Sequence, residues 1–193
     1  MTITPKILAF AGSLREGSLN KKVLQNAVAG ARAAGAEVTV IDLRDFDMPI
    51  YDADNHEKQG FPPNAVKLQD LLLENNGLLI CSPEYNGSLP GGMKNAIDWV
   101  TRKRDEGQKM YAAFNNKVAG IMSASPGSFG GLRCLAHLRG VLTIATVNVL
   151  PQEIAVTFAD QKFDGDTMTD EKTKKLLEDI GASVANTIKK LYA

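Results

Sequence analysis

Short apolar segments alternate with amphipathic helical patterns along the chain, and this alternation constrains the fold more than any other feature. Helical spacing is clear where Leu19, Val23, Ala27 and Ala31 recur every four residues and the pattern ends at Gly35. Nearly continuous apolar strands that alternate with helices are typical of a parallel sheet covered by helices on both faces. The segments that predict strands are 6–11, 37–43, 77–82, 117–125 and 143–150.

We therefore predict an α/β fold with a doubly wound, five-stranded parallel sheet in the order 2-1-3-4-5. The chain of 193 residues is long enough for one large core, and no segment has the composition of a linker, so we expect a single domain over residues 1–193. Ligands of such sheets bind beyond the carboxyl ends of the strands, at the switch point between strands 1 and 3.

The composition argues against several classes of partner and cofactor. Lys plus Arg and Asp plus Glu both number 22, so no net charge attracts nucleic acid or an anionic membrane. We expect Cys81 and Cys134 to be small buried residues of a reducing compartment, and His56 and His137 lack metal-ligand spacing. The apolar N-terminal stretch is too short for a signal sequence, and no apolar run could span a membrane. We expect a cytoplasmic protein without a bound metal.

Three loops rich in Gly, Ser, Pro and Asn follow the first, third and fourth predicted strands. Because the carboxyl ends of parallel strands share one edge of the sheet, these loops are expected to meet there. Each loop alone could be an ordinary turn, but together they predict a binding site. Their sequences are GSLREGSLN (12–20), SPEYNGSLPGGMKN (82–95) and SASPGSFGG (123–131).

The first loop has the chemistry of a phosphate site. The hydroxyls of Ser13 and Ser18, the amide of Asn20, the guanidinium of Arg15 and the N–H groups of a helix start could surround a dianion. Ser18 could equally be an ordinary helix N-cap, and the two roles are compatible. The loop lacks the Lys-Ser/Thr pair of an ATP-binding loop, and its glycines do not match the dinucleotide fingerprint G-x-G-x-x-G. A phosphate monoester therefore fits best.

The second loop would hold the group to which the phosphate is attached. Its backbone polar groups, its single aromatic face and its amide suit a flat heteroaromatic ring with polar edges. The alternative is a packed aromatic side chain at Tyr85 and a solvent-facing acid at Glu84. Glycines of the third loop, such as Gly127, allow the backbone to approach the ring from the other side. The second-loop residues concerned are Pro83, Glu84, Tyr85, Asn86 and Gly87.

Segments 12–20, 83–99 (PEYNGSLPGGMKNAIDW) and 130–139 (GGLRCLAHLR) closely resemble the NAD(P)H-dependent FMN reductase family, which has a flavodoxin-like fold. The resemblance covers essentially the whole chain and is closest to the bacterial chromate, quinone and azo-dye reductases. It implies tightly bound FMN, with its phosphate in the first loop and its isoalloxazine ring against the second and third. The implied FMN-binding residues are Ser13, Arg15, Ser18, Leu19, Asn20, Pro83, Glu84, Tyr85, Asn86, Gly87, Ser125 and Gly127.

The resemblance also implies an NAD(P)H-dependent oxidoreductase. NAD(P)H, as a substrate, would pass a hydride to N5 on the open flavin face and leave. A small-molecule acceptor, such as a quinone, an azo compound, free flavin or chromate, would then take two electrons at the same face. We assign no catalytic side chain, because this scheme requires no acid or base from the protein. Two alternatives are a flavodoxin-type one-electron carrier, which the neutral charge disfavours, and a regulatory or structural oligomer that binds a phosphorylated metabolite at the same edge of the sheet.

We further expect a homo-oligomer, either a dimer or a tetramer. The family resemblance suggests it, and the segment 44–63 has little regular pattern although it carries several apolar side chains. Such a segment could cover a partner subunit or the rim of the flavin. The apolar side chains concerned are Met48, Ile50, Tyr51 and Phe61.

Overall fold

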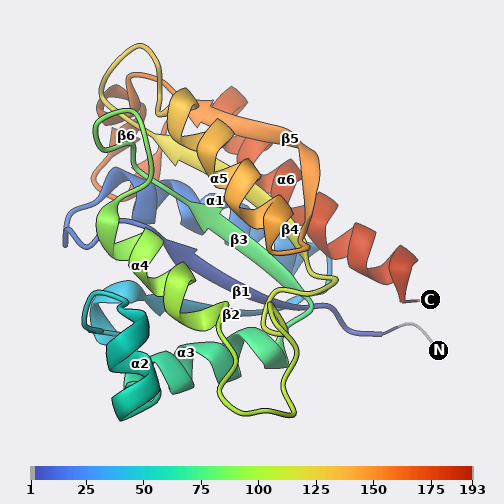
Figure 1. Cartoon of the computed structure of the whole chain (residues 1–193). Helices are drawn as coiled ribbons and strands as arrows, with labels where there is room; N and C mark the ends of the chain where they lie inside the picture. Colours follow the sequence, from blue (N-terminus) through green and yellow to red (C-terminus); the bar gives the residue numbers. More distant parts are fainter. Residues whose placement is uncertain (1–2, 193) are drawn as a thin grey trace.

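The computed structural model describes residues 3–192 and contains a five-stranded sheet between two layers of helices (Figure 1). The strands lie in the order β2-β1-β3-β4-β5, and every neighbouring pair is parallel. The predicted doubly wound sheet and its strand order are therefore confirmed. The strands are β1 (Lys6–Ala11), β2 (Glu37–Asp42), β3 (Gly77–Cys81), β4 (Val118–Ala124) and β5 (Asn148–Val156).

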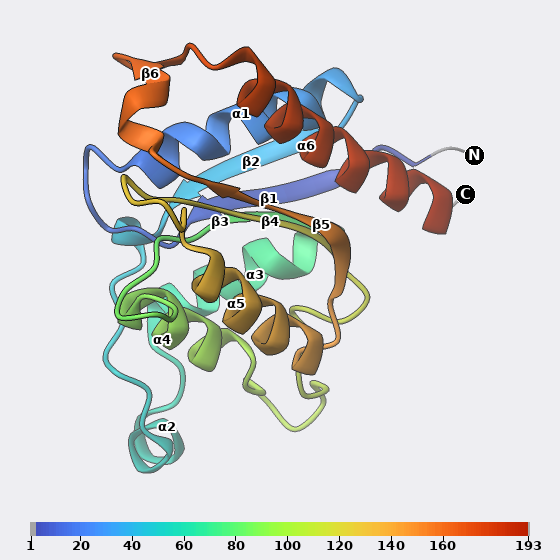
Figure 2. The same ribbon diagram turned by 90° about the horizontal axis from the view of Figure 1, so that it is seen from above.

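Helices cover both faces of the sheet, and each face has its own apolar core. On one face lie α1 (Leu19–Ala33) and α6 (Glu171–Leu191), and on the other lie α3 (Pro63–Glu74), α4 (Gly91–Val100) and α5 (Leu132–Ile144) (Figure 2). The side chains of the central strands β3 and β4 are all buried, as their continuous apolar sequences predict. The shorter elements are η1 (Leu43–Asp45), α2 (Ala53–Gln59), η2 (Ala159–Lys162), β6 (Phe163–Asp164) and β7 (Thr167–Met168).

The fifth strand lies later in the chain than the sequence predicts. The prediction of a strand at 143–150 is wrong at its start, because α5 continues to Ile144 and β5 begins only at Asn148. The predicted strand also ends at residue 150, whereas β5 continues to Val156. The sequence signal stops there because Pro151 and the polar residues after it are atypical of a buried strand. They are tolerated here because β5 is an edge strand whose register with β4 shifts opposite them.

The segment 44–63 is more regular than its sequence suggests. It contains the short helix α2. Three aromatic rings of the segment pack edge to face around Trp99 on α4. The centroid of the Trp99 ring lies 5.0 Å from that of Tyr51, 5.6 Å from that of His56 and 5.7 Å from that of Phe61. Much of the apolar surface of this segment therefore covers a helix of its own chain.

Candidate functional site

A cavity of about 180 Å³ lies at the carboxyl ends of the strands and brings the three predicted loops together. Most of the predicted site residues line it, whereas Asn86, Gly87 and Gly127 lie outside its lining. Ala124 and Pro126 also line the cavity. The sequence did not predict them, because its only signal for them was their position next to Ser125. The lining residues are Ser13, Arg15, Ser18, Leu19, Asn20, Pro83, Glu84, Tyr85, Ala124, Ser125 and Pro126.

Helix α1 begins at this cavity with Ser18 as its N-cap. The Ser18 hydroxyl accepts a hydrogen bond from the Asn20 N–H at 3.2 Å, so the predicted cap is confirmed. Within residues 3–192, the backbone N–H groups of Gly17, Ser18 and Leu19 donate to no protein acceptor. Unpaired N–H groups and the positive end of the helix dipole together favour an anion at this position.

Arg15 supplies the positive charge of the cavity lining. Its side chain is exposed, and in the described part of the chain the guanidinium forms neither a salt bridge nor a hydrogen bond. The Arg15 backbone N–H donates to the buried Ser13 hydroxyl at 3.3 Å, which holds the start of the loop. The guanidinium is therefore available to an anionic ligand at the start of α1.

The Asn20 side chain connects the first loop to the end of β4. Its Nδ2 donates to the Ala124 carbonyl at 2.9 Å, and its Oδ1 accepts from the Ala124 N–H at 2.9 Å. The Cys81 thiol donates to the same oxygen at 3.3 Å. At most one amide hydrogen of Asn20 remains for a ligand, so this residue acts first by shaping the loop.

The Glu84 carboxylate caps the N-terminus of α5. It accepts hydrogen bonds from the backbone N–H groups of Arg133 and Cys134 at 3.1 and 3.2 Å, and from Arg133 Nε at 2.7 Å. The hydrogen bond from the Arg133 side chain lowers the pKa of Glu84, and its side chain is only 10% exposed. The alternative of a solvent-facing acid at this position is therefore wrong.

Arg133 supports the site through Glu84 without lining the cavity, and the sequence did not predict this role. Besides its bonds to Glu84, its guanidinium lies over the Phe129 ring, 5.1 Å from the ring centroid. It therefore links the loops after β3 and β4 through α5. One signal could have found it, because Arg133 lies in the first turn of a helix, where a positive charge is unfavourable next to the helix dipole. Such a position indicates a nearby acid that compensates the charge.

The loop after β3 contains a tight turn that presents Tyr85. The backbone of Tyr85 and that of Ser88 exchange hydrogen bonds of 3.0 and 3.1 Å. Asn86 and Gly87 have φ values of 52° and 79°, which is the conformation that Asn-Gly favours in such turns. The Tyr85 side chain is 47% exposed, so the alternative of a packed aromatic residue is excluded. Asn86 and Gly87 set the position of the ring rather than line the cavity.

The loop after β4 is held by its own hydrogen bonds. The Ser125 hydroxyl accepts from the Gly127 N–H at 3.1 Å, so Gly127 orders the loop without lining the cavity. A Cβ atom on Gly131, which has a φ of 87°, would lie 2.8 Å from the Ser123 hydroxyl. Glycine is therefore required where this loop enters α5.

Both cysteines are free and buried beneath this site. Burial raises the pKa of both thiols, and Cys134 donates to the Ser82 hydroxyl at 3.2 Å. Their predicted character as small buried residues is confirmed. Among residues 3–192, no three or more His, Cys, Asp or Glu side chains form a group that could hold a metal ion. No helix in the described part of the chain combines the length and the apolar character needed to cross a membrane.

The chain is similar in sequence and in structure to known reductases. Residues 5–161, which include every lining residue of the cavity, match the family model for NADPH-dependent FMN reductases. The chain is 34% identical over 175 residues to an NAD(P)H-dependent FMN reductase of Pseudomonas aeruginosa, covering 90% of this chain and 89% of that protein. It is 36% identical over 146 residues to a quinone reductase of Escherichia coli, covering 75% and 73%. Its structure is similar to that of FerB, a flavoenzyme NAD(P)H:(acceptor) oxidoreductase from Paracoccus denitrificans, with a TM-score of 0.81, 29% identity and coverage of 97% and 98%.

Proposed function

The chain belongs to the NADPH-dependent FMN reductase family, and from this premise we propose that it reduces quinones by two-electron transfer from NAD(P)H through FMN held in the cavity of about 180 Å³. It is an NAD(P)H-dependent oxidoreductase with FMN as its cofactor and a flavodoxin-like fold, as the motifs in the sequence predict. Family membership also favours an enzyme over a one-electron carrier or a regulatory oligomer.

The donor set around the start of α1 fits the phosphate of FMN. Among residues 3–192, the backbone N–H groups of Ser18 and Leu19 and the Arg15 guanidinium have no protein partner, and they lie with two serine hydroxyls at one end of the cavity. We assign the phosphate to Ser13, Arg15, Ser18 and the backbone of Leu19, with Asn20 shaping the loop around it. This convergence of anion-binding groups is the observation that carries the proposal.

The isoalloxazine ring is assigned to the other end of the cavity. Pro83 and the half-exposed Tyr85 ring offer apolar surface, and Ser125 offers a hydroxyl from the opposite loop. Glu84 supports this end through α5, because its carboxylate is already bonded there. Asn86, Gly87 and Gly127 belong to the site through the turns that they form.

Bound FMN supplies the redox chemistry by accepting a hydride from NAD(P)H and delivering two electrons to the acceptor. The chain's own residues bind and orient it, and no side chain is assigned as a general acid or base. We propose a ping-pong mechanism, in which donor and acceptor occupy the same open face in turn. An exposed face of this kind also accepts azo compounds, free flavin and chromate, which we propose as further acceptors.

A steady-state experiment tests this function. The pure protein is expected to be yellow, with about one FMN per chain, because the first loop offers one phosphate site. Varying NADH or NADPH at several fixed concentrations of 1,4-benzoquinone should give parallel double-reciprocal lines. Intersecting lines would contradict the ping-pong mechanism, and a colourless protein that takes up no added FMN would overturn the assignment.

We also propose a homodimer or homotetramer that resides in the cytoplasm. Exposed apolar side chains, including Ile50 at 86% and Ile144 at 70% exposure, offer surface that a second copy could cover. The location rests on the two free, buried cysteines, which are typical of a reducing compartment.

A further inference from the structure

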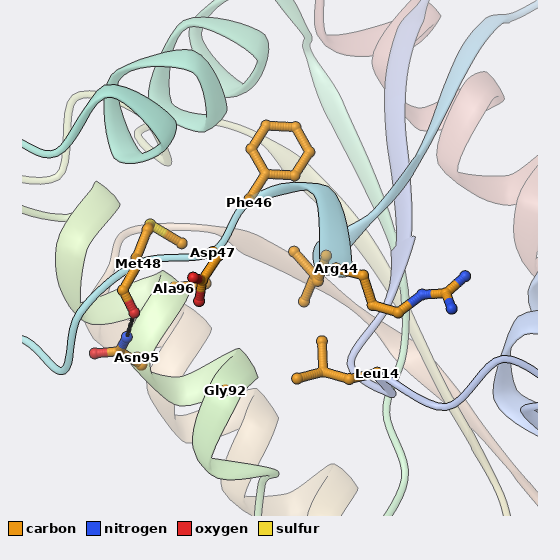
Figure 3. A pocket seen from close by; sticks show the side chains of 9 residues that line it. Leu14, Arg44, Phe46, Asp47, Met48, Gly92, Asn95 and Ala96 are labelled. Atoms are coloured by element: carbon orange, nitrogen blue, oxygen red, sulfur yellow. Dashed lines mark hydrogen bonds between the residues drawn. The ribbon is translucent and has the colours of Figure 1, made fainter.

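A second cavity, of about 240 Å³, lies against the loop that follows β1 (Figure 3). Leu14 lines this cavity, whereas its neighbours Ser13 and Arg15 line the FMN cavity. One short loop therefore forms a wall of both cavities. Its lining includes Leu14, Arg44, Asp47, Asn95 and Ala96.

The walls of this cavity are mainly apolar, and most of its polar groups are already bonded elsewhere. The Asn95 amide donates to the Pro49 carbonyl at 2.9 Å and accepts from the Tyr51 N–H at 2.8 Å. The Arg44 guanidinium is held by Asp42, with Nε 3.0 Å from Oδ2, and extends away from the other labelled side chains in Figure 3. The Asn95 amide is therefore committed to the backbone, and the charge of Arg44 is paired with Asp42.

Asp47 is different, because its carboxylate forms no ion pair or side-chain hydrogen bond within residues 3–192. Figure 3 shows this carboxylate directed toward α4, on the side of the cavity where Ala96 lies. The cavity thus combines apolar walls, which suit a flat ring, with one available anionic acceptor. A ligand that fits it carries an apolar ring and hydroxyl donors.

We propose that this cavity binds the adenosine half of NADH, with the adenine between its apolar walls and the ribose hydroxyls donating to Asp47. The inference rests on the proposed function, which makes a reduced nicotinamide dinucleotide the electron donor. Because Leu14 lines this cavity and its neighbours Ser13 and Arg15 line the FMN cavity, a dinucleotide can place one half in each. The nicotinamide half then reaches the neighbouring FMN cavity.

The Asp47 carboxylate also selects between the two donors. A carboxylate accepts hydrogen bonds from a ribose diol, whereas it repels the 2′-phosphate of NADPH. A quinone has carbonyl acceptors and no donor for this group, so the acceptor does not match the cavity. The enzyme therefore prefers NADH to NADPH.

The test compares donors of different length at a fixed concentration of 1,4-benzoquinone. The kcat/KM values of NADH, NADPH and reduced nicotinamide mononucleotide, which lacks the adenosine, are measured with FMN-loaded wild type, Asp47→Asn and Asp47→Lys. Asp45→Asn and Asp45→Lys are the matched controls, because Asp45 is exposed, lies in the same segment and does not line the cavity.

In Asp47→Asn the ratio of kcat/KM for NADH to that for NADPH should fall about tenfold or more, the size of one charge-assisted hydrogen bond. Asp47→Lys should reverse the preference, and both variants should use the mononucleotide like the wild type. Unchanged ratios in both variants, or an equal loss with the mononucleotide, would overturn the inference. A wild type that reduces quinone with none of the three donors would instead overturn the proposed function.

Discussion

Arg15 brings a positive charge to the cavity and forms no ion pair with any other residue from 3 to 192, which makes its contribution to FMN binding measurable. Arg15→Ala should weaken FMN binding about ten- to a hundredfold, because a charge-assisted hydrogen bond contributes roughly 1.5 to 3 kcal/mol. Titration calorimetry of the apoprotein with FMN measures the change. Arg32→Ala, at the exposed far end of α1, is the control and should leave the affinity unchanged. Equal affinity in Arg15→Ala and the wild type would show that Arg15 does not contact the phosphate.

The Glu84 carboxylate should stabilise the fold in a pH-dependent way. Its pKa is lowered by the hydrogen bond from Arg133, so its contribution is present above the unfolded pKa of about 4.3 and is lost as pH falls through the lowered folded value. Glu84→Gln should cost about 1 kcal/mol at pH 7, and the difference from the wild type should shrink toward acidic pH.

Urea denaturation at several pH values measures this difference. Glu57→Gln, on the exposed helix α2, serves as the control and should stay within about 0.5 kcal/mol of the wild type at each pH. A Glu84→Gln deficit that does not change between pH 7 and the acidic range would exclude the ion pair as its cause.

At the scale of elements, α1 and α6 approach so closely that two glycines are required at their crossing. A Cβ atom on Gly30 would lie 2.0 Å from the Glu178 carbonyl oxygen, and one on Gly181 would lie 1.9 Å from the Ala27 carbonyl oxygen. Because both obstacles are backbone atoms, a methyl group at either position would force the helices apart. This contact sets how closely the two helices approach each other.

The same substitution should therefore have opposite effects at two helical glycines. Gly30→Ala should lower the free energy of unfolding by about 3 kcal/mol through overpacking. Gly140→Ala, on α5, should raise it by up to about 1 kcal/mol, because a Cβ there meets no atom of residues 3–192 outside its own helical turns within 4 Å and alanine favours the helix. Thermal and urea unfolding of both variants measure the two effects. A stabilised Gly30→Ala variant would show that the helices can separate at little cost.

For the whole molecule, the proposed oligomer predicts a particle larger than one chain of 20.8 kDa. Light scattering at micromolar concentration should give twice or four times this mass, because burial of exposed apolar side chains such as Ile50 and Ile144 favours association. Measuring the mass with and without FMN shows whether the oligomer depends on the bound cofactor. A mass of one chain under both conditions would refute the oligomer.

The sequence predicts much of the candidate site because the rules for parallel sheets place loops as well as strands. Three loops distant in the chain meet in one cavity because the carboxyl ends of β1, β3 and β4 lie at one edge. Local chemistry also indicates the Ser18 cap. The assignment of FMN contacts within this cavity stays a prediction.

By itself, then, the sequence determined the features that depend on neighbouring residues: the alternation of strands and helices, the strand order that follows from it, and the Ser18 helix cap. Only the tertiary structure decided which distant groups meet. In the folded chain Glu84 bonds to Arg133, and the Asn20 amide bonds to the backbone of Ala124. The fold also forms a cavity that Asp47 lines. The physical reason is that a hydrogen bond or a cavity depends on positions in space to within about 0.3 Å, whereas a residue pattern specifies only the type of element that it forms.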